Sequence, residues 1–266
     1  MNAPAAASRW LVPDWPAPAC VRAAVTTREL PGASRAPYDA FNLGAHCGDD
    51  PVGVVANRAA IVPLLALPAA PRWLRQVHGV DVACFDDASD RVVDAAQEAA
   101  IADAAVTRTP DVVLCVLTAD CLPVLVCADD GSEVAAIHAG WRGLAAGAIE
   151  ACVARMRTPA GRLLAWIGPA IGARSYEVGE EVRSAFVAQA AAAAAAFVST
   201  RPGHWLCDLP ALARQRLAAI GFQRVYGGDF DTATDARFYS HRRDKVSGRF
   251  ASLIWIADAV PCLPIA

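Results

Sequence analysis

The sequence predicts an α+β (mixed α/β) fold, a single layered domain in which mixed β-sheets are flanked by helices. Short runs rich in Val, Leu and Ile fill residues 72–126, separated by turn residues, and are typical of buried strands. Segments that open at Asp50 and Asp208 have helical patterns instead. Hydrophobic residues make up 55% of the chain and charged residues 19%, which favours a folded protein. Because no repeat or linker divides the sequence, we expect residues 1–266 to form one domain.

The N-terminal part begins with a Pro-rich stretch that we interpret as an irregular lead-in over residues 1–20. A first strand is expected at residues 21–27. Asp50 and Pro51 suit the N-cap and first position of a helix, which Pro63 should end or kink.

In the central part, strands are predicted in the segments RWLRQV, VDVACF, ADAAVT, DVVLCVLT and LPVLVC, followed by a strand at residues 133–138. A turn containing Gly140 and Gly143 should lead into a helix at residues 144–156. A further strand is expected at residues 163–167.

In the C-terminal part, a helix is expected at residues 177–197, because this segment contains seven consecutive alanines and alanine is the best helix former. A second, amphipathic helix is expected at residues 208–220, closed by Gly221 in the C′ position. Residues 224–226 and 251–256 have strand patterns.

Composition also excludes several classes of function. The net charge of −3 makes nucleic acid an unsuitable main partner. The best apolar run, residues 112–126, is interrupted by Asp120 and is too short to span a membrane. The N-terminus lacks the basic and apolar regions of a secretory signal, so we expect a cytoplasmic protein. Nine cysteines without a CxxC pair argue against a disulfide framework and a zinc ribbon, and most are expected to be reduced core residues.

Three potential metal ligands occur where predicted strands run out into turns, namely His78, Cys121 and His138. Two imidazoles and one thiolate, with a fourth position for water, are an ordinary composition for catalytic zinc. Two other interpretations use the same residues. The histidines can be satisfied turn residues beside a buried thiol. Alternatively, Cys121 can be a nucleophile with His138 as base and an Asp as orienter, for acyl-transfer or amidase chemistry.

Arg142 lies just beyond His138, in a Gly-rich turn that opens a predicted helix. Backbone amides and a guanidinium could face an anion there, and the alternative is a surface ion pair. His46, His204 and His241 have no companion ligand near them in the sequence, so we expect them to be structural or exposed.

Several motifs together resemble one bacterial family: TTRELPGASRAPYDAFNLGAHCGDDP, WLRQVHG, ADAAVT, LTADCLPVL, AAIHAGWRGLAAG, AWIGPAIGARSYEVGEEV and FYSHRRDKVSGRFASLIWI. The family was once described as polyphenol oxidase or laccase-domain proteins, and later as purine nucleoside phosphorylase and as peptidoglycan editing factor. The resemblance covers residues 26–256, and TADC and HAGWRG are highly specific in combination. The chain is identified as a member of this family.

The resemblance implies a layered α/β domain with one zinc ion per chain, held by the three ligands named above, which copper could replace in vitro. It implies phosphorolysis of adenosine, inosine, guanosine and methylthioadenosine, and deamination of adenosine to inosine. The implied partners are small purine nucleosides and phosphate, without nucleic acid or membrane, for a monomer or weak homo-oligomer. Arg58 matches a residue of the substrate pocket, and Asn42 and Arg28 fall in motif positions that line it.

Deamination and phosphorolysis need different groups in the site. In deamination, zinc would activate water for attack at C6 of the purine. Asp120 is the candidate proton shuttle, although an extended backbone would point its side chain away from that of Cys121. In phosphorolysis, Arg58 and Arg142 are the expected phosphate-binding cations.

Two other activities are alternatives to deamination and phosphorolysis. The alternative function is a Cys/His or zinc hydrolase that removes a misplaced amino acid from peptidoglycan precursors. A multicopper oxidase is physically implausible, because the whole chain has only five histidines to hold several copper ions.

Overall fold

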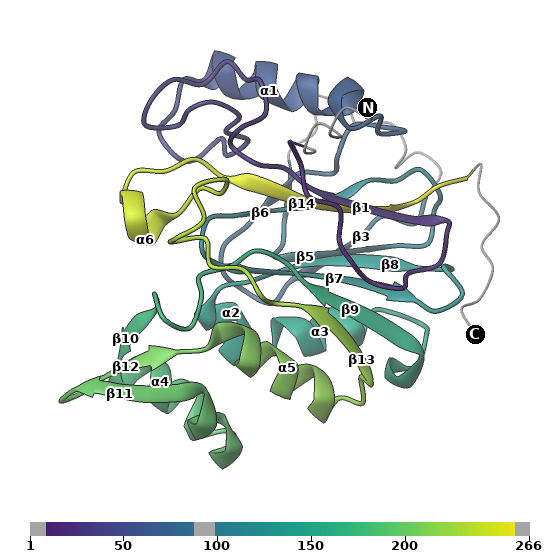
Figure 1. Cartoon of the computed structure of the whole chain (residues 1–266). Coiled ribbons are helices and arrows are strands. Elements are labelled where there is room, and N and C mark those ends of the chain that lie inside the picture. Colours follow the sequence, from purple (N-terminus) through teal and green to yellow (C-terminus); the bar gives the residue numbers. More distant parts are fainter. Residues whose placement is uncertain (1–8, 88–98, 259–266) are drawn as a thin grey trace, which may run out of the picture.

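Two stacked β-sheets form the centre of the molecule, and helices cover both outer faces (Figure 1). The computed structural model describes residues 9–87 and 99–258, so residues 1–8 of the predicted lead-in lie outside the described residues. In order, the layers are helix α1, a three-stranded sheet, a six-stranded sheet, and helices α2, α3 and α5. The predicted mixed α/β class is confirmed.

The six-stranded sheet combines antiparallel and parallel pairs. Its centre is the antiparallel pair of β7 (Leu122–Ala128) and β8 (Val134–Ala139), in which every residue is buried. Continuous burial is expected of strands that are covered on both faces. The sheet continues from β7 through β9 (Leu163–Ile167) to β13 (Arg224–Gly227), and from β8 through β5 (Ala104–Thr107) to β3 (Val82–Cys84).

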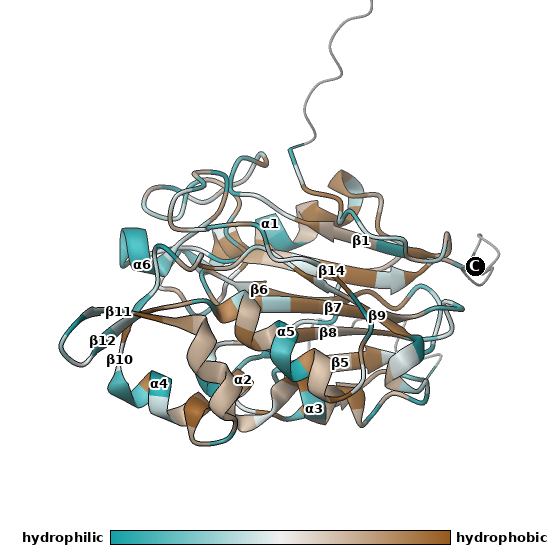
Figure 2. Cartoon of the chain, turned by 60° about the horizontal axis from the view of Figure 1, so that its bottom comes forward, coloured by the Kyte–Doolittle hydropathy of each residue, from teal (hydrophilic) through white to brown (hydrophobic). Residues whose placement is uncertain are grey.

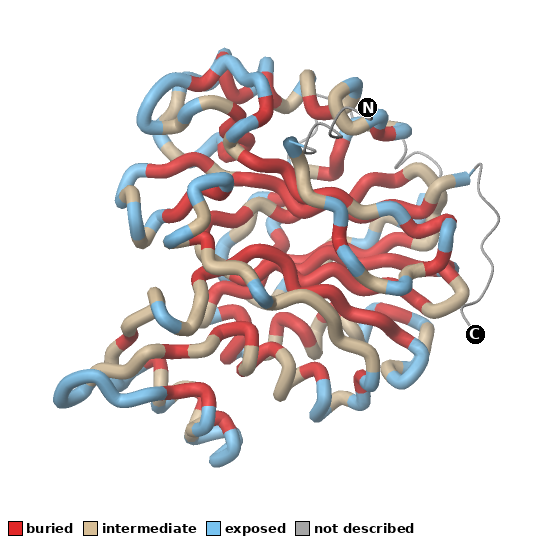
Figure 3. Tube along the Cα trace, viewed as in Figure 1, coloured by how far each residue is buried: buried red, intermediate tan, exposed pale blue. Residues whose placement is uncertain are grey.

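The three-stranded sheet has β14 (Phe250–Ile256) at its centre, antiparallel to β1 (Val21–Val25) and β6 (Leu114–Thr118). Side chains alternate between its two faces. Phe250 therefore packs into the core between the sheets, whereas Leu253 packs on the opposite face. Figure 3 shows buried residues concentrated in the strands of both sheets, and Figure 2 shows that many of these residues are hydrophobic.

Helix α1 (Pro51–Leu64) covers the outer face of the three-stranded sheet. The Asp50 carboxylate accepts a hydrogen bond from Val52 N at 3.1 Å, so the predicted start of this helix is confirmed. Pro63 lies within the last turn, and the helix ends one residue later.

The helix predicted at residues 144–156 starts earlier and is divided. α2 (Trp141–Ala146) begins directly after Gly140, and α3 (Ala148–Val153) follows Gly147. The backbone of Gly147 is left-handed, with φ of 98°, and a residue in this conformation ends an α-helix. Gly143, which we had assigned to the preceding turn, belongs to α2.

The helix predicted at residues 177–197 is wrong over much of its length. Residues Glu177–Gly179 form strand β10, and α4 covers only Glu180–Val187. The alanines of Ala191–Ala196 form a 3-10 helix. Alanine's helix preference amounts to a few tenths of a kcal/mol per residue over ordinary residues, so tertiary contacts can override it.

Those contacts come from a further, small sheet that lies at one end of the molecule (Figure 1). In it β12 (His204–Cys207) pairs with β10 and with β11 (Phe197–Arg201). The hydrogen bond from Asp208 N to Ala196 O, at 2.8 Å, fixes the end of the alanine segment.

The helix predicted at residues 208–220 is confirmed. α5 (Leu209–Ala219) has Asp208 as its N-cap and is followed by Gly221 with φ of 101°. None of the helices in the described ranges is long and apolar enough to cross a bilayer. Short elements complete the fold, namely β2 (Leu74–Arg75), β4 (Ala100–Ile101) and α6 (His241–Asp244). The predicted strands at residues 21–27, 133–138, 163–167, 224–226 and 251–256 are confirmed as β1, β8, β9, β13 and β14.

Candidate metal centre

The structure brings His78, Cys121 and His138 together into one cluster. One donor atom from each residue lies within 4.8 Å of the other two. Cys121 Sγ is 3.7 Å from His78 Nε2, and the two imidazole rings meet edge to face with centroids 4.8 Å apart. In tetrahedral zinc coordination, nitrogen and sulfur donors lie about 3.5 Å from one another. The cluster could therefore bind a metal ion, and its donor set of two imidazoles and a thiolate suits zinc.

Cys121 lies where the chain passes from one sheet to the other, between the end of β6 and the start of β7. The neighbouring Asp120 makes this passage with a left-handed backbone, at φ of 81°. Its carboxylate accepts hydrogen bonds from Thr232 Oγ1 at 2.7 Å and Arg242 N at 2.6 Å. Asp120 therefore anchors the crossover to the segment that precedes β14.

Asp103 joins the two histidines of the cluster. Its fully buried carboxylate accepts a hydrogen bond from His138 Nδ1 at 2.8 Å. The same carboxylate accepts from the backbone N–H groups of Val77, His78 and Gly79 at 3.1, 2.9 and 2.7 Å. It thereby fixes the turn that carries His78, whose φ is 60°. Because Nδ1 of His138 faces Asp103, the ring's Nε2 is left for the cluster.

The electrostatics of the cluster favour charged groups despite their burial. Burial raises the pKa of Asp103, but the hydrogen bonds from His138, Gly79 and Val77 lower it to about 2. Burial likewise raises the pKa of Cys121, and the two imidazoles bring it down to about 6. Burial lowers the pKa of His138, whereas Asp103 and Cys121 raise it to about 9. A proton on His138 and a metal ion therefore compete for the same nitrogen.

Two glycines of the HAGWRG motif allow α2 to lie against the cluster. A Cβ atom on Gly140 would be 2.8 Å from His78 Cδ2 and 3.0 Å from Cys121 Sγ. A Cβ atom on Gly143 would be 3.0 Å from Gly79 O, in the turn that carries His78. The glycines are thus required by the close approach of the helix.

The cluster lines a cavity of about 440 Å³. Five positively charged or imidazole-bearing residues outside the cluster also line it, and no Asp or Glu of the described ranges does so. Two of the five, His46 and His241, are exposed as predicted, but no local sequence pattern places them at this cavity. The five are His46, Arg58, Arg75, His241 and Arg249.

Of the other predicted site residues, Arg58 lines the cavity. Its Nε donates to Leu43 O at 2.9 Å, and its guanidinium stacks on Trp73 with 4.3 Å to the ring centroid. Asn42 is buried outside the lining, where Oδ1 accepts from Gly44 N and Arg249 N at 2.9 and 2.7 Å. It supports the cavity wall through these backbone groups.

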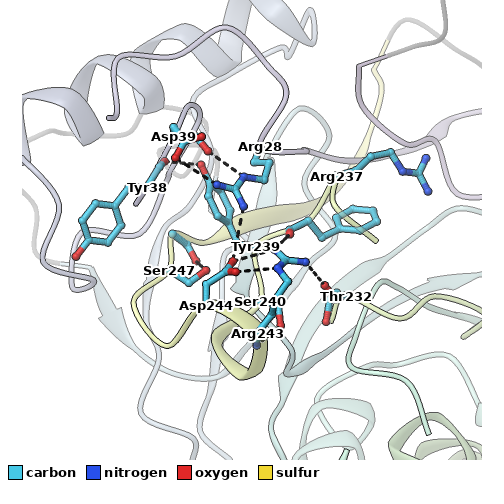
Figure 4. A network of polar contacts seen from close by, with 12 residues as sticks. Arg28, Tyr38, Asp39, Thr232, Arg237, Tyr239, Ser240, Arg243, Asp244 and Ser247 are labelled. Atoms are coloured by element: carbon cyan, nitrogen blue, oxygen red, sulfur yellow. Dashed lines mark hydrogen bonds and ion pairs between the residues drawn. The ribbon is translucent and has the colours of Figure 1, made fainter. Parts of the chain in front are cut away.

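Two arginines that were predicted for the pocket do not line the cavity. Arg142 is exposed, stacks on Trp141 at 4.4 Å and does not line the cavity. Arg28 lies in the polar network of Figure 4, where it contacts Asp39 at 3.3 Å and Asp244 at 3.7 Å. Its charge is therefore balanced within the fold.

Sequence reasoning missed two residues that position the site. Asp103 stands in the quoted ADAAVT segment, where a single acid beside a buried apolar strand was the available signal. Gln76, in WLRQVHG, joins the turn of His78 to β6. Its side chain bonds the backbone N and O of Leu117, both at 2.8 Å.

We expect Gly140→Ala to lower metal affinity sharply without unfolding the chain. The backbone φ of −63° at Gly140 suits alanine, so the new Cβ acts only by pushing on His78 and Cys121. Metal content after dialysis, measured by mass spectrometry, tests this. Gly161→Ala is the control, because its Cβ would meet nothing nearer than 4.0 Å. Full metal occupancy in Gly140→Ala would refute the close-approach argument.

Asp103→Asn should weaken metal binding by about 10- to 100-fold, the usual cost of losing a partner that orients a ligand. The amide NH₂ group cannot accept the hydrogen bonds that the lost carboxylate oxygen accepted. Competition with a chromophoric chelator measures the affinity. Asp81→Asn, the same change at an exposed carboxylate, serves as the control. Equal affinities for the two folded variants would show that Asp103 does not position the ligands.

Comparison with known proteins places this site in a family. A family model described as multi-copper polyphenol oxidoreductase laccase matches residues 22–257. Purine nucleoside phosphorylase of Xylella fastidiosa is 52% identical over 253 residues, covering 92% of this chain and 96% of that protein. Purine nucleoside phosphorylase YfiH of Escherichia coli is 48% identical, covering 94% and 99%.

A solved structure agrees with the fold. The crystal structure of Neisseria meningitidis protein NMB0706 superimposes with a TM-score of 0.86 at 43% identity, covering 94% of this chain and 99% of that one. The chain therefore belongs to the family described as multi-copper polyphenol oxidoreductase laccase, and it is a relative of enzymes named purine nucleoside phosphorylase.

Proposed function

We propose that this chain is a zinc-dependent purine nucleoside phosphorylase that acts on adenosine, inosine, guanosine and methylthioadenosine. The observation that carries the proposal is a cavity lined by the His78, Cys121 and His138 cluster and by cations, with no carboxylate among its described lining residues. A volume of about 440 Å³ falls within the usual range of small-molecule sites. The names of the relatives supply the substrate class.

In phosphorolysis, a phosphate oxygen forms a bond to C1′ of the ribose while the bond from C1′ to the purine nitrogen breaks. The electron pair of that bond leaves with the purine. Arg58 would hold the phosphate, because it lines the cavity and its guanidinium is fixed by Leu43 O and Trp73. A zinc ion held by the cluster would supply a Lewis acid.

We infer deamination of adenosine to inosine as a second activity of the same cavity. It requires a group that moves a proton between water and the purine. Asp120, the candidate from sequence, has its carboxylate bonded by Thr232 and Arg242 and does not line the cavity. This activity therefore has weaker support than phosphorolysis.

One observation favours the hydrolase alternative. Cys121, His138 and Asp103 form a series of thiol, imidazole and carboxylate, in which His138 Nδ1 is 2.8 Å from Asp103. The same order of groups activates nucleophilic cysteines. In this version Cys121 attacks an acyl group, as needed to remove a misplaced amino acid from a peptidoglycan precursor.

Incubation of metal-quantified protein with adenosine, with and without phosphate, tests the proposal. We expect adenine and ribose 1-phosphate only when phosphate is present, with loss of activity on zinc removal and recovery on zinc return. Inosine in both conditions would establish the deaminase. Cys121→Ser should abolish both zinc binding and activity, whereas Cys84→Ser, at an exposed thiol outside the cavity, should preserve them.

The adenosine incubation, together with an assay on an aminoacylated precursor, separates the phosphorylase from the hydrolase alternative. Absence of any nucleoside product from protein that carries one zinc ion per chain would refute the phosphorylase proposal. Hydrolysis of an aminoacylated precursor by zinc-free protein would assign the cluster to cysteine chemistry instead.

A further inference from the structure

Two arginines from distant parts of the sequence converge on one loop of the cavity wall. Arg58, from α1, binds Leu43 O through Nε at 2.9 Å. Arg249, immediately before β14, accepts the Leu43 N–H at its backbone O at 3.1 Å, and its side chain lies over Gly44. Burial raises the pKa of the Cys47 thiol, and the charges of Arg249 and Arg58 oppose this rise. The charges of both arginines thus act on the same thiol of the cavity lining.

Neither of these two charges is balanced by a carboxylate of the described residues. Arg249 Nη1 donates to the carbonyl oxygens of Ser247 and Gly248 at 2.8 and 2.9 Å. Arg58 has Leu43 O and the Trp73 ring as its partners. These neutral groups hold both guanidiniums in place but leave their charge uncompensated. Burial accordingly lowers the pKa of Arg58 from its ordinary value.

Asp49, the acid whose charge acts on Cys47 together with these arginines, does not line the cavity beside them. Its carboxylate accepts bonds from Ser34 Oγ at 2.6 Å and Asn42 Nδ2 at 2.9 Å. Some arginines elsewhere in the described fold pair with acids, as Arg162 does with Asp129 at 2.7 Å, whereas Arg214 and Arg242 bond carbonyl oxygens. Arg58 and Arg249 differ from those two arginines in lining the cavity beside the metal cluster, where an anion can reach them.

We propose that Arg58 and Arg249 together form an oxyanion subsite that binds inorganic phosphate in the cavity. The assignment rests on the proposed phosphorolysis, and it replaces Arg142, the partner expected from sequence, with Arg249. A fixed guanidinium presents parallel N–H donors to two oxygens of a phosphate. Two such groups, already held by carbonyls and an aromatic ring, lose little freedom on binding the anion.

Calorimetric titration of the full chain with inorganic phosphate, without nucleoside, tests the subsite directly. Arg249→Met should weaken phosphate binding about 10- to 100-fold, the range expected for hydrogen bonds to a charged group. Arg249→Lys should retain part of the affinity, because the charge remains while the fork is lost. Arg157→Met is the control, because Arg157 is exposed and lies near Glu133, at the opposite end of β8 from His138.

Steady-state kinetics supply an independent readout. Arg249→Met should raise KM for phosphate while KM for adenosine and the metal content stay unchanged. Unchanged phosphate binding in folded Arg249→Met and Arg249→Lys, or a loss seen only in Arg142→Met, would overturn the subsite. Binding of adenosine 5′-monophosphate without binding of inorganic phosphate would also overturn it, in favour of a phosphate ester.

These outcomes are distinguishable from failure of the proposed function. Phosphate binding that depends on Arg249, in a protein that forms no adenine, would retain the subsite and refute the phosphorylase. Adenine formation with an unchanged KM for phosphate in Arg249→Met would support the phosphorylase and refute the subsite.

Discussion

The hydrogen bonds of the Asp103 carboxylate are the constraint on which the candidate metal centre depends. A buried carboxylate is costly unless its oxygens are satisfied, and here one imidazole and three backbone N–H groups satisfy them. The three backbone groups belong to the turn that carries His78, and the imidazole belongs to His138. The Asp103 side chain thus positions two candidate ligands, His78 and His138, that come from different parts of the chain. The candidate metal site depends on this interaction, because it fixes both the turn that carries His78 and the ring of His138.

The stacked sheets supply the third ligand. Cys121 lies where the chain crosses from β6 to β7, and the bonds of Asp120 to Thr232 and Arg242 secure this crossing. The close approach of α2 then requires Gly140. A single added methyl group there would press on His78 and Cys121 while leaving all three candidate ligands in the sequence. The close packing around the centre therefore limits the size of the side chains that can lie next to the three candidate ligands.

Apolar runs are local signals, and they were sufficient to predict most of the strands. Strand-end His and Cys residues singled out His78, Cys121 and His138 as candidate ligands, which the structure brings into one cluster. Prediction from sequence failed where tertiary contacts outweigh local preference. The alanine segment follows the pairing of Phe197 with Cys207, and Gly147 divides a helix that periodicity predicts as continuous. Asp103 and Arg249 reach the site only through contacts between distant segments. Arg142 lies close to His138 in sequence, but it stacks on Trp141 outside the cavity.

The family description points to multicopper oxidation, whereas the names of the relatives point to purine nucleoside phosphorolysis. The residues of this chain favour the names of the relatives. Several copper ions need many imidazoles, whereas this chain has five histidines and the described residues form one cluster of three donors. The most direct test of this account is X-ray absorption at the zinc edge on protein loaded with one equivalent of zinc. The account predicts one sulfur at about 2.3 Å and two imidazole nitrogens at about 2.0 Å, with the sulfur lost in Cys121→Ser. A spectrum without sulfur, or one unchanged in Cys121→Ser, would contradict it.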